Sequence, residues 1–104
     1  MFVYQRQITE AIEFARQSLD KLPEDDHFFR QIAAWNLSGL LFISGDQEGG
    51  AKMLEEVARI SLECSNLLVA IVALCRLGSY QMQRGKLSLA TELFEQAISV
   101  RPDN

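Results

Sequence analysis

The sequence predicts an all-α fold, built as an antiparallel stack of about five helices that pair with their neighbours along the chain. Three observations lead to this prediction. Apolar residues recur at the spacing of one helix face, two segments match each other at an offset of 40 residues, and a glycine divides each of these segments. Strand signals are missing, because Val and Ile occur only within helical periodicity and no Asn-Gly or Asp-Gly hairpin turn is present.

The first helix is expected over residues 4–21. Its apolar residues follow the pattern i, i+3, i+4, i+7 and i+11, namely Ile8, Ala11, Ile12, Ala15 and Leu19. Pro23 ends this helix, since proline cannot continue the hydrogen-bond ladder, and Asp25 or Asp26 can cap the next helix, expected over residues 26–44. This first helix has no partner before it in the chain and is therefore a half unit.

Each of the two repeated segments combines an apolar helix, a glycine turn and an amphipathic helix. Gly45 and Gly85 stand where one helix must stop and another begin almost at once, which suits glycine because it adopts the left-handed conformation without strain. Asp46 can cap the helix after the first turn. The remaining helices are expected over residues 47–64, 67–84 and 87–100, and Pro102 ends the last one. The short connections make neighbouring helices antiparallel.

Residue sizes along the two segments predict how the helices pack. Small residues let two helices approach closely, and they occur at Ser38, Gly50, Gly78, Ala90 and Ala97. Large residues beside them fill the seam, at Leu37, Leu54, Leu77, Leu93 and Phe94. Methionines and aromatic residues are expected to fill the core and the seams between repeats rather than to form a cofactor box, with some of them exposed. They are Met53, Met82, Phe28, Phe29, Trp35, Phe42, Tyr80 and Phe94. The chain is therefore expected to be a single domain, residues 1–104, with a half repeat at 4–21 and repeats at 26–64 and 67–104.

Charge and hydropathy exclude several classes of partner. The chain has 10 Lys and Arg against 14 Asp and Glu, a formal charge of −4, so it lacks the basic surface of a nucleic-acid binder or an anionic-lipid binder. No uncharged apolar run of about 18 residues is present, and the first six residues do not read as a signal peptide. We therefore expect a cytoplasmic protein without direct contacts to nucleic acid or membrane.

The residues that carry chemistry are few. Cys64 and Cys75 lie in apolar helical patterns, which favours two buried free thiols in a reducing compartment, with a disulfide or a metal site as the alternatives. His27 has no second imidazole to join it in a zinc site. No Ser/His/Asp set occurs, and the carboxylates are expected on solvated helix faces. We expect no enzyme activity, no cofactor and no metal.

The second unit resembles the tetratricopeptide repeat, whose pattern is W-x-x-L-G-x-x-Y … A-x-x-x-F … A … P. It reads Leu74-x-x-Leu77-Gly78, then Gly85, then Ala90-x-x-x-Phe94-x-x-Ala97 and Pro102. Leu74 stands for the Trp, and Gln81 occupies the position of the usual aromatic residue. The first unit is looser, with Ala34-x-x-Leu37-Ser38, Gly45-Asp46 and Gly50-x-x-x-Leu54-x-x-Val57. The resemblance covers nearly the whole chain and implies a right-handed superhelix.

Finer features are similar to the helical sensor region of MalT-type regulators of the LuxR family in bacteria. They are the 40-residue offset, the segment Leu22–Asp26, the segment Ala33–Leu37 and the turn Ser44–Asp46. In that family the region lies between a nucleotide-binding ATPase module and a C-terminal helix-turn-helix, and it senses an inducer and supports oligomerisation. The chain has no phosphate-binding loop and no basic recognition helix. It opens on half a repeat and closes at Pro102-Asp103-Asn104, which fits an excised fragment of a longer regulator.

The resemblance also points to a ligand-facing surface. In tetratricopeptide proteins the first helix of each pair lines a concave groove, and Asn36 and Arg76 match positions that often contact a peptide. Ser79 and Gln83 lie on the same side of their helix. Two functions follow: the sensor and interaction segment of a bacterial transcription regulator, with a protein, a peptide or a small inducer as ligand, or a free-standing adaptor that binds a partner peptide in its groove.

The ends of the stack are a second expected interaction surface. Terminal repeats need a polar outer face to remain monomeric, and here the last helix is only partly polar. Its outer side combines Glu92, Glu95, Gln96 and Ser99 with apolar residues, and Phe2 and Tyr4 precede or open the first helix. We therefore expect a tendency to self-associate through an end face.

Overall fold

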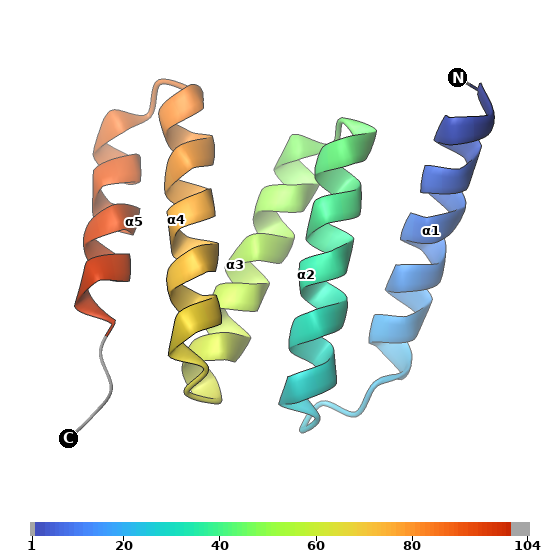
Figure 1. Cartoon of the computed structure of the whole chain (residues 1–104), viewed down its shortest axis with the longest axis horizontal. Coiled ribbons are helices and arrows are strands. Elements are labelled where there is room, and N and C mark those ends of the chain that lie inside the picture. The colour runs from blue at the N-terminus through green and yellow to red at the C-terminus, as the bar shows by residue number, and fades with distance from the viewer. Residues whose placement is uncertain (1, 101–104) are drawn as a thin grey trace. The chain divides into compact units, whose positions relative to one another are not determined.

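The computed structural model describes the backbone of residues 2–100 and the side chains of residues 5–100. It contains five helices and, between residues 2 and 100, no strand (Figure 1). The helices are α1 (Phe2–Lys21), α2 (His27–Ser44), α3 (Gln47–Glu63), α4 (Leu67–Gln83) and α5 (Leu87–Ser99). Every predicted helix is present, and each predicted boundary lies within two residues of the observed one. The role given to Pro102 lies outside the described residues.

The two glycine turns have the same hydrogen-bond pattern. At the end of α2 the Gly45 N–H donates to the Phe42 carbonyl at 3.1 Å, and the Asp46 N–H donates to the Leu41 carbonyl at 2.9 Å. At the end of α4 the matching bonds are Gly85 to Met82 at 3.0 Å and Lys86 to Gln81 at 2.9 Å. Gly45 and Gly85 have φ of 95° and 77°, the left-handed conformation that this closing motif requires. The prediction for both glycines is confirmed.

The sequence placed the break between α3 and α4 near Ser65 and Asn66, but it did not predict that this turn closes in the same way. The Asn66 N–H donates to the Ser61 carbonyl at 2.8 Å, and the residue between helices with positive φ is Ser65, at 60°. A residue with a Cβ is strained in this region, so the turn is held by its hydrogen bonds rather than by intrinsic preference. Sequence reasoning missed it because no glycine marks the position.

Helix starts follow the predicted acidic caps. The carboxylate of Asp26 accepts a hydrogen bond from the Phe29 N–H at the start of α2, at 3.3 Å. The carboxylate of Asp46 accepts one from the Gly49 N–H at the start of α3, at 2.9 Å. Each bond satisfies one of the N–H groups that a helix leaves unpaired at its N-terminus.

Contacts along the chain cluster into two compact units, residues 1–53 and residues 54–104. The division falls inside α3 rather than in a linker, so the first unit contains α1, α2 and the first turns of α3. The second unit contains the rest of α3 with α4 and α5. The assignment of the whole chain to one domain stays a prediction.

The first unit is held by the packing of α1 against α2 and by the close approach of α2 to the start of α3. The guanidinium of Arg30, on α2, donates to the carbonyls of Leu19 and Leu22 at 3.3 and 3.1 Å. These carbonyls lie in the last turn of α1 and just beyond it, where a positive charge is favourable. Ser38 is buried, and its hydroxyl donates to the Gly50 carbonyl at 3.1 Å.

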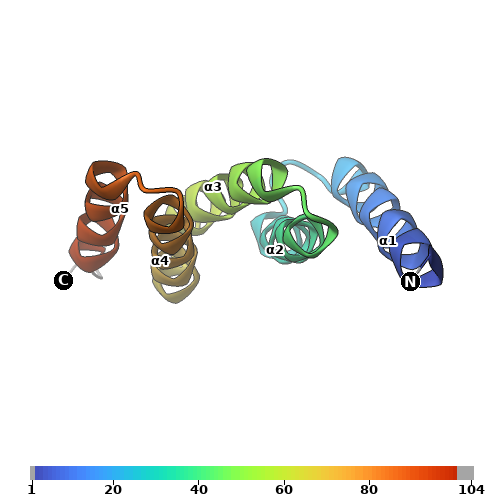
Figure 2. The ribbon, with the colours of Figure 1, turned by 90° about the horizontal axis from the view of Figure 1, so that it is seen from above.

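The second unit contains the antiparallel pair α4 and α5, which lie side by side (Figure 2). Gly78 and Ala97 are buried in this pair, as predicted for residues that permit close helix packing. A Cβ at Gly78 would lie 2.8 Å from the ring of Phe94, so only glycine allows this ring its position. The predicted small residues are buried in both units, and so are the large ones Leu37, Leu54 and Leu77, whereas Leu93 and Phe94 are half-buried.

Candidate functional site

A row of exposed residues on α2 includes the first of the predicted ligand-facing positions. Asn36, Gly39 and Ile43 are three and four residues apart and therefore share one helix face. With Trp35 and Leu40 they line a shallow hollow of about 350 Å³. No atom lies within 4 Å of the place that a Cβ of Gly39 would take. The hollow thus places bare backbone and apolar side chains beside a carboxamide that can both donate and accept hydrogen bonds.

The other predicted ligand-facing residues form a polar row on α4. Arg76, Ser79 and Gln83 also stand three and four residues apart, and all three are exposed. A guanidinium, a hydroxyl and a carboxamide in one row suit a peptide backbone or a carboxylate, because they supply several donors and two acceptors. This row belongs to the second unit, and Asn36 belongs to the first.

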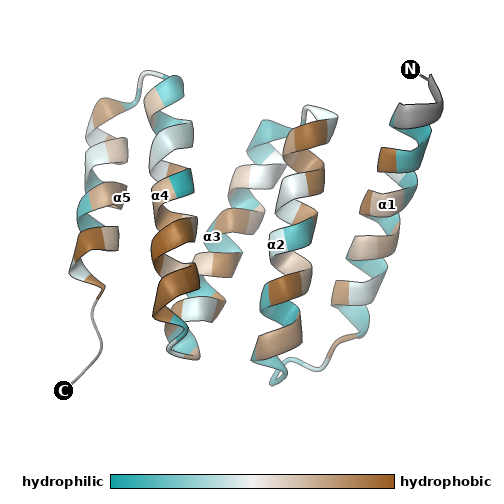
Figure 3. Ribbon diagram, in the orientation of Figure 1, coloured by the Kyte–Doolittle hydropathy of each residue, from teal (hydrophilic) through white to brown (hydrophobic). Residues whose placement is uncertain are grey.

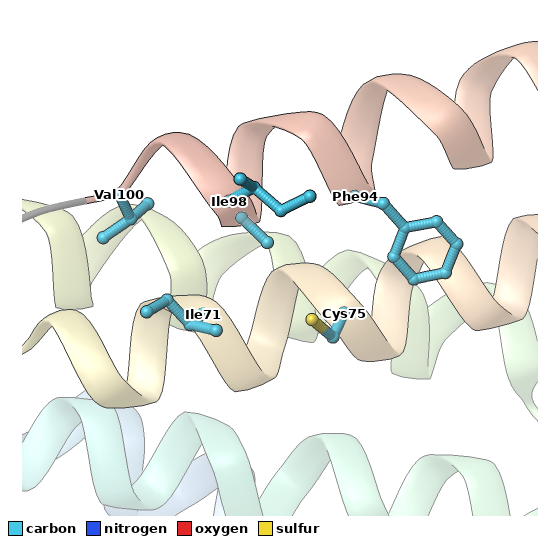
Figure 4. Close-up of a pocket in the computed structure, with 6 residues that line it drawn as sticks. Ile71, Cys75, Phe94, Ile98 and Val100 are labelled. Atoms are coloured by element: carbon cyan, nitrogen blue, oxygen red, sulfur yellow. The ribbon is translucent and has the colours of Figure 1, made fainter.

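An apolar hollow between α4 and α5 was not assigned to named residues by sequence reasoning. It has a volume of about 450 Å³ and is lined by Ile71, Cys75, Phe94, Ala97, Ile98 and Val100. Figure 4 shows Ile71 and Cys75 reaching from α4 towards Phe94, Ile98 and Val100 on the α5 side. One feature of the sequence indicated an apolar surface here. Ile98 follows Phe94 by four residues and therefore lies on the same face of α5.

Two expectations about burial were wrong. Cys64 is exposed, because α3 ends at Glu63 and Cys64 lies in the following turn instead of on a buried helix face. Cys75 is half-buried at the α4–α5 hollow, and neither Cys64 nor Cys75 forms a disulfide. Phe28 and Phe29 are exposed rather than in the core, and their rings meet edge to face with centroids 5.1 Å apart.

The titratable groups form surface pairs rather than a reactive cluster. Among the described residues no group of three His, Cys, Asp or Glu side chains converges to hold a metal ion. On α3, Arg59 pairs with Glu56 and with Glu63. The hydrogen bonds that the Arg59 guanidinium donates to the Glu56 carboxylate, together with the negative charges of Glu56 and Glu63, raise the pKa of Arg59 above its ordinary value. Since a guanidinium is already charged at ordinary pH, this shift adds no titration near neutrality.

The structure also bears on membrane insertion. No helix within residues 2–100 is both long enough and apolar enough to span a bilayer.

The chain matches the family described as the MalT-like TPR region, and the match extends over residues 1–104. It belongs to this family. Both resemblances drawn from the sequence, to tetratricopeptide repeats and to the MalT-type sensor region, are confirmed. Comparison with curated proteins found no match, and comparison with solved structures found none either.

Membership of the MalT-like TPR family directs attention to surfaces that can bind another molecule. Tetratricopeptide-type repeats are generally non-catalytic and generally mediate protein interactions. The rows on α2 and α4 and the α4–α5 hollow are therefore treated as candidate binding surfaces. The roles of Asn36, Arg76, Ser79 and Gln83 stay predictions.

Proposed function

We propose that this chain is the sensor and interaction segment of a bacterial transcription regulator of the MalT type, which acts in the cytoplasm. The observation that carries the proposal is the family match over residues 1–104. In such a regulator an ATPase module and a DNA-binding module lie elsewhere in the protein, so this segment binds the signal and passes it on. The signal is a protein, a peptide or a small inducer, and no cofactor takes part.

The gene that encodes the chain tests this proposal directly. We expect the complete reading frame to encode a phosphate-loop ATPase module before this segment and a helix-turn-helix after it. Sequencing the reading frame in full is sufficient. A reading frame that encodes neither module would refute the regulator proposal while leaving the family assignment intact.

The polar row on α4 supports a second function, an adaptor that captures a partner peptide. Arg76, Ser79 and Gln83 are exposed in one row, and a guanidinium bonds well to a carboxylate or a carbonyl. On the first unit, Asn36 beside the apolar hollow of α2 offers a carboxamide to a peptide backbone. The adaptor function would hold whether or not DNA-binding and ATPase modules accompany the segment.

A peptide-library screen with the 104-residue chain tests the adaptor function. Arg76→Ala should weaken the binding of a selected peptide about tenfold, the effect of losing one charge-assisted hydrogen bond. Arg16→Ala is the matched control, because Arg16 is also exposed and its loss changes the net charge equally. Absence of any binding peptide, or equal effects of the two substitutions, would count against the adaptor.

A further inference from the structure

The exposed face of α2 extends well beyond its hollow. Phe28 and Ile32 continue the row of Asn36, Gly39 and Ile43 towards the start of the helix, because the five residues follow one another at intervals of three or four. All five are exposed, Phe28 to 62% and Ile43 to 69% of their surface. Figure 3 shows hydrophobic segments near both ends of α2. We call these five residues the α2 stripe.

Neighbouring helices already pack against two other sides of α2. One neighbour is α1, and the other is the start of α3, where the ring of Phe42 lies against Gly50. The places that adjacent repeat helices take beside α2 are therefore filled, and the α2 stripe is exposed all the same. A further helix pair added to the stack does not account for it, since each repeat contacts only its neighbours.

Gly39 is the one glycine within the described helices whose missing side chain the chain itself does not use. At Gly49, Gly50 and Gly78 the atom nearest to the place of a Cβ lies 2.4, 2.7 and 2.8 Å away, whereas at Gly39 nothing lies within 4 Å. Gly39 also has no positive φ that would require glycine. An exposed glycine inside a helix lowers stability relative to alanine, but its bare backbone lets another molecule approach closely.

The polarity of the α2 stripe determines which backbone conformation fits it. An extended peptide needs partners for its N–H and C=O groups, and Asn36 is the only one of the five residues with a side chain that forms hydrogen bonds. An α-helix bonds these groups internally, so it can cover an apolar stripe without leaving them unpaired. Phe28 and Ile43 are 15 residues apart, which is about 22 Å or four turns of a partner helix.

The charges around the α2 stripe select among possible helices. Arg30 is the only Lys, Arg, Asp or Glu residue in α2, and its guanidinium bonds to carbonyls at the end of α1. Exposed carboxylates lie just outside both ends of α2, at Glu24 and Asp25 before it and at Asp46 and Glu48 after it. A helix with basic residues at both ends complements these charges. A second copy of α2, in either direction, would place carboxylates against carboxylates.

We propose that the α2 stripe binds an amphipathic α-helix of a partner protein, with an apolar face of about four turns and basic residues at both ends. The proposal rests on the interaction role proposed for this segment and names the class of partner. The partner helix packs at Gly39, a large side chain enters the hollow of about 350 Å³, and Asn36 meets a polar side chain. A contact of about 22 by 10 Å is smaller than stable interfaces, so binding is weak and reversible.

Fluorescence anisotropy of a labelled synthetic helix, titrated with the 104-residue chain, tests the proposal. The probe has about 18 residues, with leucine at every third or fourth position, alanine and glutamine elsewhere, and two lysines at each end. We expect a dissociation constant of about 10–500 µM, in the range of weak complexes. A scrambled peptide of the same composition has no apolar face and should bind at least about tenfold more weakly. Glutamates in place of the lysines should also weaken binding, and high salt should reduce that difference.

Gly39→Leu separates partner binding from folding. Nothing lies within 4 Å of a Cβ at Gly39, so leucine fits and the thermal midpoint should not fall. The new side chain fills the space that the partner backbone needs, so the dissociation constant of the lysine-ended probe should rise at least about tenfold. Gln96→Leu is the matched control, because it adds the same side chain at an exposed position of α5 and should bind like the unmodified chain.

Three outcomes would overturn the proposal. They are equal binding of the designed and scrambled peptides, equal binding by the Gly39→Leu and Gln96→Leu variants, and sedimentation of the chain as a dimer that Gly39→Leu abolishes. In the last case a second copy covers the α2 stripe. The adaptor function can fail separately, because it is tested by Arg76→Ala with a peptide selected from a library, and the regulator proposal is tested on the reading frame.

Discussion

Two helix pairs are joined by a glycine turn: α2 with the start of α3, and α4 with α5. In both pairs an aromatic ring packs against a glycine of the other helix, but the ring and the glycine exchange helices between the two pairs. In the first pair the ring of Phe42, on the leading helix, lies against Gly50 on the following helix. In the second pair the ring of Phe94, on the following helix, lies against Gly78 on the leading helix. A Cβ would lie 2.7 Å from the ring at Gly50 and 2.8 Å from it at Gly78.

The residues that replace each glycine at the 40-residue offset complete this comparison. Gly78 corresponds to Ser38, which is buried and donates a hydrogen bond to the Gly50 carbonyl. Gly50 corresponds to Ala90, which is also buried. Both repeats thus place a large residue against a small one. The large residue can come from the leading helix or from the following helix. What matters physically is the distance between helix axes, since several combinations of side chains fill the same space.

The largest expected change in stability comes from adding a methyl group to either glycine that packs against a ring, and the two glycines should differ in this change. Gly50→Ala should destabilise the protein by about 1–2 kcal/mol, because overpacking outweighs the gain in helix propensity. The atoms closest to a Cβ at Gly50 include Cγ of Phe42, which moves only if χ1 or the backbone changes. At Gly78 the closest atoms lie towards the far end of the Phe94 ring. Gly78→Ala should therefore cost less, and urea unfolding measures both.

The control for these two substitutions is Gly39→Ala. Nothing lies within 4 Å of a Cβ at Gly39, so this change should stabilise α2 by up to about 1 kcal/mol through helix propensity alone. Adding Phe42→Leu to Gly50→Ala should recover part of the lost stability. If Gly50→Ala were as stable as Gly39→Ala, the ring contact would not control the spacing of the first pair.

A smaller change in stability is expected on replacing Gln81, a polar residue that is buried in the second pair. Gln81 is 9% exposed, and its Oε1 has no hydrogen-bond partner within the part of the chain that the structure describes. Its counterpart in the first pair is Leu41, which is buried. Gln81→Leu should stabilise the protein by about 1 kcal/mol, because it removes a buried unpaired acceptor. Gln96→Leu, at an exposed position, should leave the thermal midpoint almost unchanged, and a loss of stability for Gln81→Leu would indicate a partner at this site.

The smallest expected effect concerns the helix start after each glycine. Asp46 caps α3 with its side chain, whereas Lys86 precedes α5 without a side-chain hydrogen bond and places a positive charge at a helix N-terminus. Lys86→Asp should stabilise the protein by about 0.5–1 kcal/mol, measured by thermal unfolding at low and high salt. Lys86→Ala separates the removal of the charge from the new cap, and equal stability of the two variants would show that no cap forms.

Local signals account for the parts of the fold that could be predicted. The helices and both glycine turns follow from apolar spacing, from Pro23 and from glycine at positions of positive φ, all of which act within a few residues. The exposure of Asn36, Arg76, Ser79 and Gln83 could also be predicted, because helical spacing alone places them opposite buried residues.

The features that sequence reasoning missed depend on residues far apart in the chain or on a turn without its usual marker. Arg30 binds the end of α1 only because α2 folds back beside it. Ser65 adopts a positive φ because hydrogen bonds close the turn around it. The exposure of Cys64 follows from where α3 stops.

The sequence by itself determined where this chain forms helices, where it turns and to which family it belongs. Hydrophobic periodicity and turn residues act within a few positions of the chain, so they can be interpreted without knowing which helices pack together. Only the tertiary structure decided which ring meets which glycine and which apolar residues line the hollow between α4 and α5. Those choices depend on how two helices approach in space, and many pairings of large and small residues satisfy the same pattern.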